Sequence, residues 1–240
     1  MRVLLILIAA ILAVFTGLAK SHELLPADIN IYPWSSIGKL YNRAGGACTG
    51  AIASLTKVVT AAHCLYNPRT SILLQPESLH FLIGYKQGEY REDLRVSKFI
   101  IGPNYKLDGA VTMTSETSDW AILKLRLPVT TGVRPLSIAN NPPKIGDRIM
   151  VGGFAQSRRY SMTADTECSV RAILSNGLLV HDCAVMKGDS GAPLMRPNGD
   201  MIEVLGVHVG TALSNGVAVR IAVPAANLID SAADLIDSRD

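Results

Sequence analysis

A histidine, an aspartate and a serine stand out in this chain by their types and their flanking residues. His63 ends a strand-like run in the passage TAAHC, Asp119 begins one in DWAIL, and Ser190 lies in the glycine-rich turn GDSGAP. A serine hydroxyl is too weakly acidic to attack an amide at neutral pH, so an imidazole must remove its proton as the new bond forms. A carboxylate can fix the tautomer of that imidazole. Together the three residues predict nucleophilic acyl transfer.

Each of the three also has a structural alternative when it is considered alone: a half-buried histidine, a polar strand start or a simple turn. Asp93 and Asp108 are alternative orienting carboxylates, although neither begins an apolar strand-like run. The glycines around Ser190 meet one more requirement of acyl transfer, because they let backbone N–H groups point at a developing oxyanion. The combination is therefore far more specific than any single residue.

The elements that must position these residues are short strands. Apolar runs of strand length recur along the chain, about six before the Pro/Gly-rich stretch of residues 128–146 and about six after it, which predicts two β-barrels. The expected strands are residues 36–41, 49–54, 57–60, 79–84, 95–101 and 120–125, and then 148–153, 168–174, 177–181, 192–195, 202–209 and 217–221.

Two further segments have a different character. After Pro224, apolar residues recur at helical spacing, which predicts an amphipathic C-terminal helix containing Leu228, Ala232, Leu235 and Ile236. Residues 104–118 are small and polar, which predicts an exposed loop, and we expect its part just before Asp119, Gly109–Ser118, to tune access to the cleft.

Composition excludes several classes of protein. Of the 240 residues, 48% are hydrophobic and the formal net charge is +3, so the chain is too apolar and too weakly charged to be disordered. Its basic residues are scattered, whereas nucleic-acid binding needs a clustered basic surface.

The first nineteen residues resemble a secretory signal peptide. Arg2 provides the positive start, an apolar stretch follows, and small residues precede a cleavage site after Ala19. The alternative is a permanent anchor, because the apolar stretch is at the short limit for spanning a bilayer. We expect a cleaved signal (residues 1–19), a mature domain of residues 20–240 that is secreted or periplasmic, and no stable membrane association afterwards.

The four cysteines lie in two close pairs separated by about a hundred residues. In an oxidising compartment we favour Cys48–Cys64 and Cys168–Cys183, although sequence alone allows three connectivities. Closing each loop would stabilise the fold by about 3 kcal/mol in the chain-entropy model. A zinc site is the competing interpretation, but no pair has the short spacing that such sites favour.

With these flanking residues, the chain order His63, Asp119, Ser190 resembles the trypsin/chymotrypsin-like serine proteases. The resemblance runs from about Ile31 to the C-terminal helix. It implies an all-β fold of two six-stranded antiparallel barrels with the site in the cleft between them. It also implies that His63 is general base and then acid, that Asp119 orients it, that Ser190 is the nucleophile, and that the N–H groups of Gly188 and Ser190 form the oxyanion hole.

The resemblance also supports the Cys48–Cys64 bridge, which in that family tethers the loop of the catalytic histidine. One departure concerns activation. Animal trypsins begin their mature chain with IVGG, whose new amino group pairs with the aspartate before the nucleophile. Nothing like it precedes Cys48 here. Asp189 therefore needs another partner, and activation by trypsin-type cleavage is disfavoured.

A second departure concerns the specificity pocket. Six residues before the serine, where trypsin carries the aspartate that selects Arg or Lys, stands Ala184, with Asp182 two residues further back. The passage LGVHVGT resembles the bacterial V8/glutamyl endopeptidase-like branch, in which a histidine faces the glutamate side chain of the substrate. His208 stands at that position, Thr211 offers a hydroxyl, and Lys187 adds positive charge. A buried carboxylate needs such donors. The alternative is a structural histidine bonded to the neighbouring strand.

The sequence thus predicts a serine endopeptidase that acts on proteins or peptides, with glutamate, then small apolar, then basic residues as choices before the cleaved bond. No cofactor or metal is expected, because His22 and His80 lack acidic or cysteine neighbours at ligand spacing. Two alternatives remain: a catalytically silent or latent binding protein on the same fold, and a serine esterase.

Overall fold

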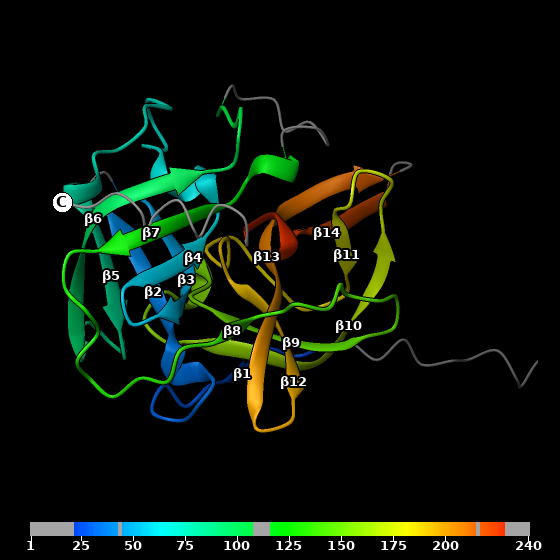
Figure 1. The fold of residues 1–240 in the computed structure, drawn as a ribbon, viewed down its shortest axis with the longest axis horizontal. Coiled ribbons are helices and arrows are strands. Elements are labelled where there is room, and N and C mark those ends of the chain that lie inside the picture. Colours follow the sequence, from blue (N-terminus) through cyan, green and yellow to red (C-terminus); the bar gives the residue numbers. More distant parts are fainter. Residues whose placement is uncertain (1–21, 43–44, 108–115, 215–216, 229–240) are drawn as a thin grey trace, which may run out of the picture.

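The apolar runs of the sequence form two closed β-barrels that lie side by side (Figure 1). This computed structural model describes residues 22–42, 45–107, 116–214 and 217–228. The expected signal peptide therefore lies outside the described residues. Of the expected C-terminal helix, the structure describes a helical turn at residues 226–228, with Leu228 buried, and the rest lies outside.

The first barrel is antiparallel and has the strand order β2-β3-β4-β7-β6-β5, closed by pairing of β2 with β5. It contains β2 (Ile37–Asn42), β3 (Ala47–Ser54), β4 (Lys57–Thr60), β5 (Leu79–Ile83), β6 (Glu92–Ile101) and β7 (Ala121–Leu125).

The second barrel has the order β10-β11-β14-β13-β12-β9, closed by pairing of β9 with β10. It contains β9 (Arg148–Gly153), β10 (Thr163–Ile173), β11 (Leu179–His181), β12 (Pro193–Asn198), β13 (Met201–Ser214) and β14 (Val217–Pro224). Two short strands are added outside it: β1 (Leu25–Pro26) pairs with β10, and β8 (Ser137–Ile138) pairs in parallel with β13. The predicted fold of two six-stranded antiparallel barrels is confirmed.

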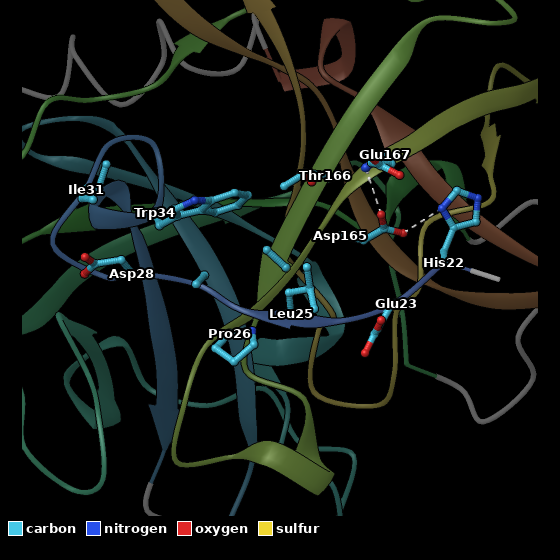
Figure 2. Close-up of a pocket in the computed structure, with 12 residues that line it drawn as sticks. His22, Glu23, Leu25, Pro26, Asp28, Ile31, Trp34, Asp165, Thr166 and Glu167 are labelled. Atoms are coloured by element: carbon cyan, nitrogen blue, oxygen red, sulfur yellow. Dashed lines mark hydrogen bonds and ion pairs between the residues drawn. The ribbon is translucent and has the colours of Figure 1, made fainter. Parts of the chain in front are cut away.

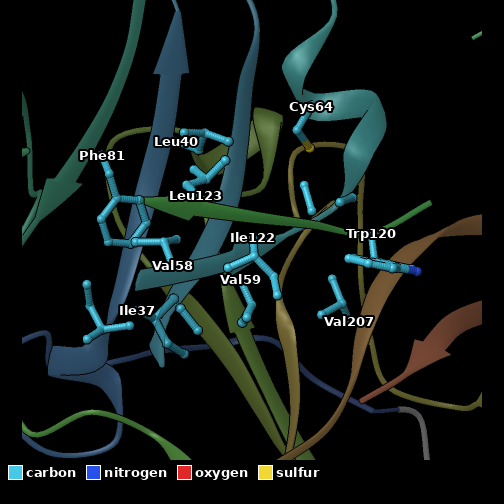
Figure 3. Close-up of a cluster of buried hydrophobic side chains, with 14 of the residues drawn as sticks. Ile37, Leu40, Val58, Val59, Cys64, Phe81, Trp120, Ile122, Leu123 and Val207 are labelled. Carbon is cyan, nitrogen blue, oxygen red and sulfur yellow. The ribbon is translucent and has the colours of Figure 1, made fainter. Parts of the chain in front are cut away.

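The core of the first barrel is filled by apolar side chains from all six strands, and Figure 3 shows part of this cluster. Phe81 is fully buried at its centre, and a Cβ at Gly38 would collide with its ring and with the Leu82 carbonyl at 2.8 Å. Glycine is thus required where Phe81 packs against β2. The cluster continues past Trp120 to Val207 of β13, so the two barrels share a packed boundary. Burial on this scale contributes roughly 25 cal/mol per Å² of apolar surface.

Five short 3₁₀ helices occur in the part of the chain that the structure describes, and two of them position residues of the site. The turn η2 (Ala62–Leu65) follows β4, and η4 (Glu116–Ser118) precedes β7. The other three are η1 (Trp34–Ser36), η3 (Pro76–Ser78) and η5 (Gln156–Arg158). Among the helical segments that the structure describes, none is both long and apolar enough to cross a bilayer.

Candidate active site

His63 is held where the first barrel meets the second. β4 ends at Thr60, the fully buried Ala61 follows, and the chain turns at once into η2, which carries His63. The next residue, Cys64, forms a disulfide with Cys48 of β3. The histidine is therefore fixed on one side by the barrel wall and on the other by a covalent link.

Asp119 holds both the ring and the backbone of that histidine. Its carboxylate is 2% exposed, Oδ2 lies 2.7 Å from His63 Nδ1, and Oδ1 accepts the His63 backbone N–H at 2.8 Å. A carboxylate at Nδ1 favours the tautomer that carries the proton there, which leaves Nε2 as an acceptor. Burial lowers the pKa of His63, but the charge and hydrogen bond of Asp119 and the charge of Glu116 outweigh it, so the net pKa is raised.

Ser190 comes from the turn that links β11 to β12 in the second barrel. It lines, together with His63, Lys187 and Gly188, a cavity of about 350 Å³ that the Cys48–Cys64 bridge borders. The carbonyl oxygen of Ser190 accepts the backbone N–H of Thr49 at 2.8 Å, which ties this turn to β3. The fold thus brings the predicted nucleophile and the predicted base to one cavity.

The serine turn depends on two glycines with left-handed backbone angles. Gly188 has φ +103° and Gly191 has φ +84°, and a Cβ at Gly188 would lie 2.6 Å from the carbonyl oxygen of Phe154. Within the described residues, the N–H groups of Gly188 and Ser190 are bonded to no acceptor. Two unpaired N–H groups beside a serine hydroxyl form the kind of donor pair that stabilises an oxyanion.

Asp189, which lies between Gly188 and Ser190 in the sequence, is 3% exposed. Its Oδ2 accepts the backbone N–H of Met186 at 2.9 Å, whereas Oδ1 is buried without a hydrogen-bond partner among the described residues. Burial raises its pKa to about 6, against the lowering effect of the Met186 hydrogen bond. The sequence predicted that Asp189 needs a partner other than a new amino terminus. In the described part of the chain, the hydrogen-bond partner of its side chain is the backbone N–H of Met186.

The four residues predicted to determine specificity do not line a single cavity. His208 is 3% exposed, and its Nδ1 lies 3.1 Å from Nε2 of His181 in an edge-to-face ring contact. Burial and then the charge of His63 lower the pKa of His208 to about 3, so the ring is neutral at working pH. Ala184 donates its backbone N–H to Asp165. Neither His208 nor Ala184 lines the two cavities beside His63.

Lys187 and Thr211 do line those cavities, one each. Of the alternative orienting residues, Asp93 on β6 pairs with His80 at 2.9 Å, and Asp108 lies outside the described residues. Both predicted disulfide pairings, Cys48–Cys64 and Cys168–Cys183, are present.

Two structural features near His63 were not anticipated from the sequence. Residues 104–118 were expected to form an exposed loop, but Tyr105 is 9% and Glu116 7% exposed. They line, with Tyr66, a second cavity on the other side of His63. Burial and then the charge of Asp119 raise the pKa of Glu116 to about 7, while His63 lowers it. The missed signal was a lone acidic residue three positions before Asp119.

One group of potential metal ligands occurs in the described part of the chain. Atoms of Cys48, His63 and Cys64 lie within 4.8 Å of one another. The two sulfurs are joined in a disulfide, so neither is a thiolate that could bind a metal.

A cavity of about 470 Å³ lies away from these residues, under the N-terminal segment (Figure 2). His22 reaches from this segment to Asp165, with Nδ1 and Oδ2 3.3 Å apart, and Trp34 covers Gly152, where a Cβ would lie 2.7 Å from its ring. The N-terminal segment therefore packs against the second barrel, and the Trp34 ring packs against Gly152 of β9.

The two-barrel fold with a His–Asp pair and a serine at the junction defines the class of chymotrypsin-like serine endopeptidases. The chain belongs to the trypsin family, whose family model matches residues 26–230. A serine protease SP24D from Anopheles gambiae is 25% identical, covering 71% of this chain and 67% of its own length. Snake venom serine protease CL2 from Trimeresurus stejnegeri is 26% identical, with 73% and 74% covered.

A solved structure of a Glu endopeptidase in complex with MPD has a TM-score of 0.74 to this chain. The match covers 90% of this chain and 97% of the endopeptidase chain at 19% identity, so it shows a similar fold.

Proposed function

We propose that this protein hydrolyses peptide bonds through an acyl-enzyme formed on Ser190, with His63 as base and Asp119 as the residue that orients it. The observation that carries the proposal is the 2.7 Å contact between His63 Nδ1 and Asp119, with Ser190 lining the same cavity as His63. Membership of the trypsin family supports a protein or peptide as substrate.

In the first half-reaction, His63 Nε2 takes the proton of the Ser190 hydroxyl as its oxygen bonds to the carbonyl carbon. The oxyanion that forms accepts hydrogen bonds from the N–H groups of Gly188 and Ser190. The imidazolium, stabilised by Asp119, then gives its proton to the leaving amine as the C–N bond breaks. In the second half-reaction, His63 takes a proton from a water molecule as the water oxygen bonds to the acyl carbon. The bond from that carbon to the Ser190 oxygen then breaks, Ser190 regains the proton from His63, and the acid product leaves.

An extended substrate can bind along β13. This strand pairs with β12 as far as Val207, and His208 still exchanges backbone hydrogen bonds with Gly191 and Ala192. Beyond His208, the described strands pair with β13 on one side, through β14. The other edge, from Val209 onward, is open to an added strand, and Val209, Gly210 and Thr211 border the cavity next to His63.

We propose in addition a preference for glutamate before the cleaved bond, with His208 as its donor. A Glu endopeptidase among the solved structures of this fold supports this proposal. Because burial and then the charge of His63 lower the pKa of His208 to about 3, the ring is neutral, and its single N–H would have to turn from its present partners, Ile221 and His181, to the substrate. The contact of His208 Nδ1 with His181 Nε2, at 3.1 Å, orients that ring.

The test is cleavage mapping by mass spectrometry with a mixed peptide pool, using the secreted protein and its Ser190→Ala variant. Ser190-dependent cleavage mostly after Glu, lost in His208→Ala, supports both proposals. Cleavage after other residues keeps the peptidase and rejects the role of His208. Folded protein that cleaves only ester substrates, or nothing, favours the esterase or the silent binding protein.

We further propose that the chain is exported. The N-terminal segment has the layout of a signal peptide, two disulfides are present, and relatives come from venom. N-terminal sequencing of protein recovered from the exported fraction would give Lys20 as the first residue, and Met1 there would reject cleavage after Ala19.

A further inference from the structure

The second cavity beside His63 has the shape and lining of a side-chain pocket. Its volume is about 380 Å³, and it lies between the first barrel and the open edge of β13. The rings of Tyr66 and Tyr105 meet edge to face on its wall, with centroids 5.9 Å apart, and Leu107 adds apolar surface. A peptide strand added to β13 would pass this opening.

A single acidic side chain, in addition to the Asp119 carboxylate that His63 engages, lines this cavity. Glu116 is 7% exposed and comes from η4. Within the described residues, no ion pair joins its carboxylate to a Lys, Arg or His. Burial and then the negative charge of the nearby Asp119 raise the pKa of Glu116 to about 7.

This arrangement is unfavourable without a ligand. Burying an ionised carboxylate is unfavourable unless a partner compensates it, and the raised pKa of Glu116 expresses this cost. The charge of Asp119 adds repulsion, and among the described residues His63 offsets part of it. A cation that enters the cavity would remove both costs.

We propose that this cavity binds the cationic side chain of a substrate lysine or arginine that lies close to the cleaved bond, with Glu116 as its counter-ion. The proposal rests on the peptidase function above and names a second point of recognition for the same substrate. The aliphatic stem of the basic residue would lie along Leu107 and the tyrosine rings, which also attract a cation through their faces.

The chemistry of the cavity discriminates between side chains. A neutral chain of equal length would fill the apolar wall but leave Glu116 unpaired. An acidic chain would be repelled by Glu116 and Asp119 together. Charge-assisted pairing with a buried carboxylate is among the stronger polar contacts in proteins, and its loss is felt as a large drop in affinity.

Binding to the Ser190→Ala protein tests this inference without catalysis. Fluorescent peptides would carry Lys, norleucine or Glu at one position, moved through the three positions on each side of the expected cleavage point. At one position, the Lys peptide should bind at least about 10-fold tighter than the norleucine peptide, and the Glu peptide weakest.

The additional substitution Glu116→Gln should bring the Lys and norleucine peptides to equal affinity. Glu77→Gln, the same change in the exposed 3₁₀ turn η3, is the matched control and should change nothing. Equal affinity of Lys and norleucine at all positions in the protein that keeps Glu116, or a Lys advantage that survives Glu116→Gln, would overturn the proposal.

This result is independent of turnover. Ser190-dependent hydrolysis without a Glu116-dependent Lys preference would reject the basic subsite and keep the peptidase. Glu116-dependent binding of Lys peptides by a protein that hydrolyses nothing would keep the basic subsite and reject the peptidase.

Discussion

The hydroxyl of Thr49 donates a hydrogen bond of 3.1 Å to the carbonyl oxygen of Gly188, joining β3 of the first barrel to the serine turn of the second. The hydroxyl oxygen of Thr49 accepts the backbone N–H of Phe154 at 3.0 Å, and the Thr49 N–H donates to the carbonyl oxygen of Ser190. Because His63 belongs to the first barrel and Ser190 to the second, this fully buried threonine sets the relative position of the two.

Thr49→Val should therefore destabilise the fold. Valine has the same shape but leaves the Gly188 carbonyl and the Phe154 N–H unpaired, and each buried unpaired group costs roughly 1–3 kcal/mol. We expect a lower melting temperature in thermal unfolding of the Ser190→Ala background, which prevents self-digestion. Thr49→Ser keeps the hydroxyl and is the matched control. Equal melting temperatures for the two variants would contradict the linking role of the hydroxyl.

Asp119→Asn should lower kcat by about 10³–10⁴-fold while the fold remains. The amide would present its NH₂ group to His63 Nδ1, so the ring proton would move to Nε2, which could then no longer accept the serine proton. Steady-state kinetics on a peptide substrate would measure this loss. Asp93→Asn is a close control, because Asp93 pairs with His80 at 2.9 Å in the same barrel, away from Ser190. A similar loss in both variants would argue for general destabilisation.

The site was predictable from sequence to the extent that its signals are local. TAAHC, DWAIL and GDSGAP each combine a reactive residue with the strand end or tight turn that presents it, and the structure brings His63 to hydrogen-bond distance of Asp119. The strands β4 (Lys57–Thr60) and β9 (Arg148–Gly153) have the predicted bounds, and a turn, at residues 55–56 and 145–146 respectively, precedes each of them.

Elements made by tertiary contact were not predictable in this way. The two-residue strands β1 and β8 exist only through pairing with β10 and β13, and so short a run has no periodicity of its own. β13 extends to Ser214, past the expected end at Val209, because β14 pairs with it along that length. Glu116 lies in a polar stretch, and its burial depends on how η4 packs against the second barrel.

The pH dependence of kcat/KM should have its acid limb above 6.5. Hydrolysis needs neutral His63, and the pKa of His63 is raised because Asp119 and Glu116 outweigh the effect of burial. Activity is thus lost on acidification through a pKa higher than that of a free imidazole.

Glu116→Gln should move this limb to lower pH, since it removes one nearby negative charge. Besides His63 and Asp119, the ionisable side chains that line this cavity with Glu116 are Tyr105 and Tyr66, and burial and then the charge of Asp119 raise the pKa of Tyr66 further above this range. The substrate for this measurement should contain no Lys or Arg, so that binding of a basic side chain beside Glu116 does not contribute to the pH dependence of kcat/KM. An acid limb that stays in place in Glu116→Gln would show that this carboxylate does not act on His63.

Stability should fall as pH rises, in part through Asp189. Burial raises its pKa in the folded state to about 6, above the value of 3.8 for an unperturbed aspartate, so the folded protein holds this proton more tightly than the unfolded chain. Its contribution is fully present below pH 4 and is lost as pH rises through about 6, by about 3 kcal/mol at most. Asp189→Asn keeps an oxygen for the Met186 N–H but cannot ionise.

In the Ser190→Ala background, the variant should gain stability relative to the parent between pH 5 and pH 8, as measured by chemical denaturation at each pH. Asp200→Asn, at an exposed turn, should run parallel to the parent. If Asp189→Asn also runs parallel to the parent, then Asp189 is ionised in the folded protein with a compensating cation. The amino group that trypsins supply would then have a counterpart here, and the unpaired Oδ1 would be the atom that receives it.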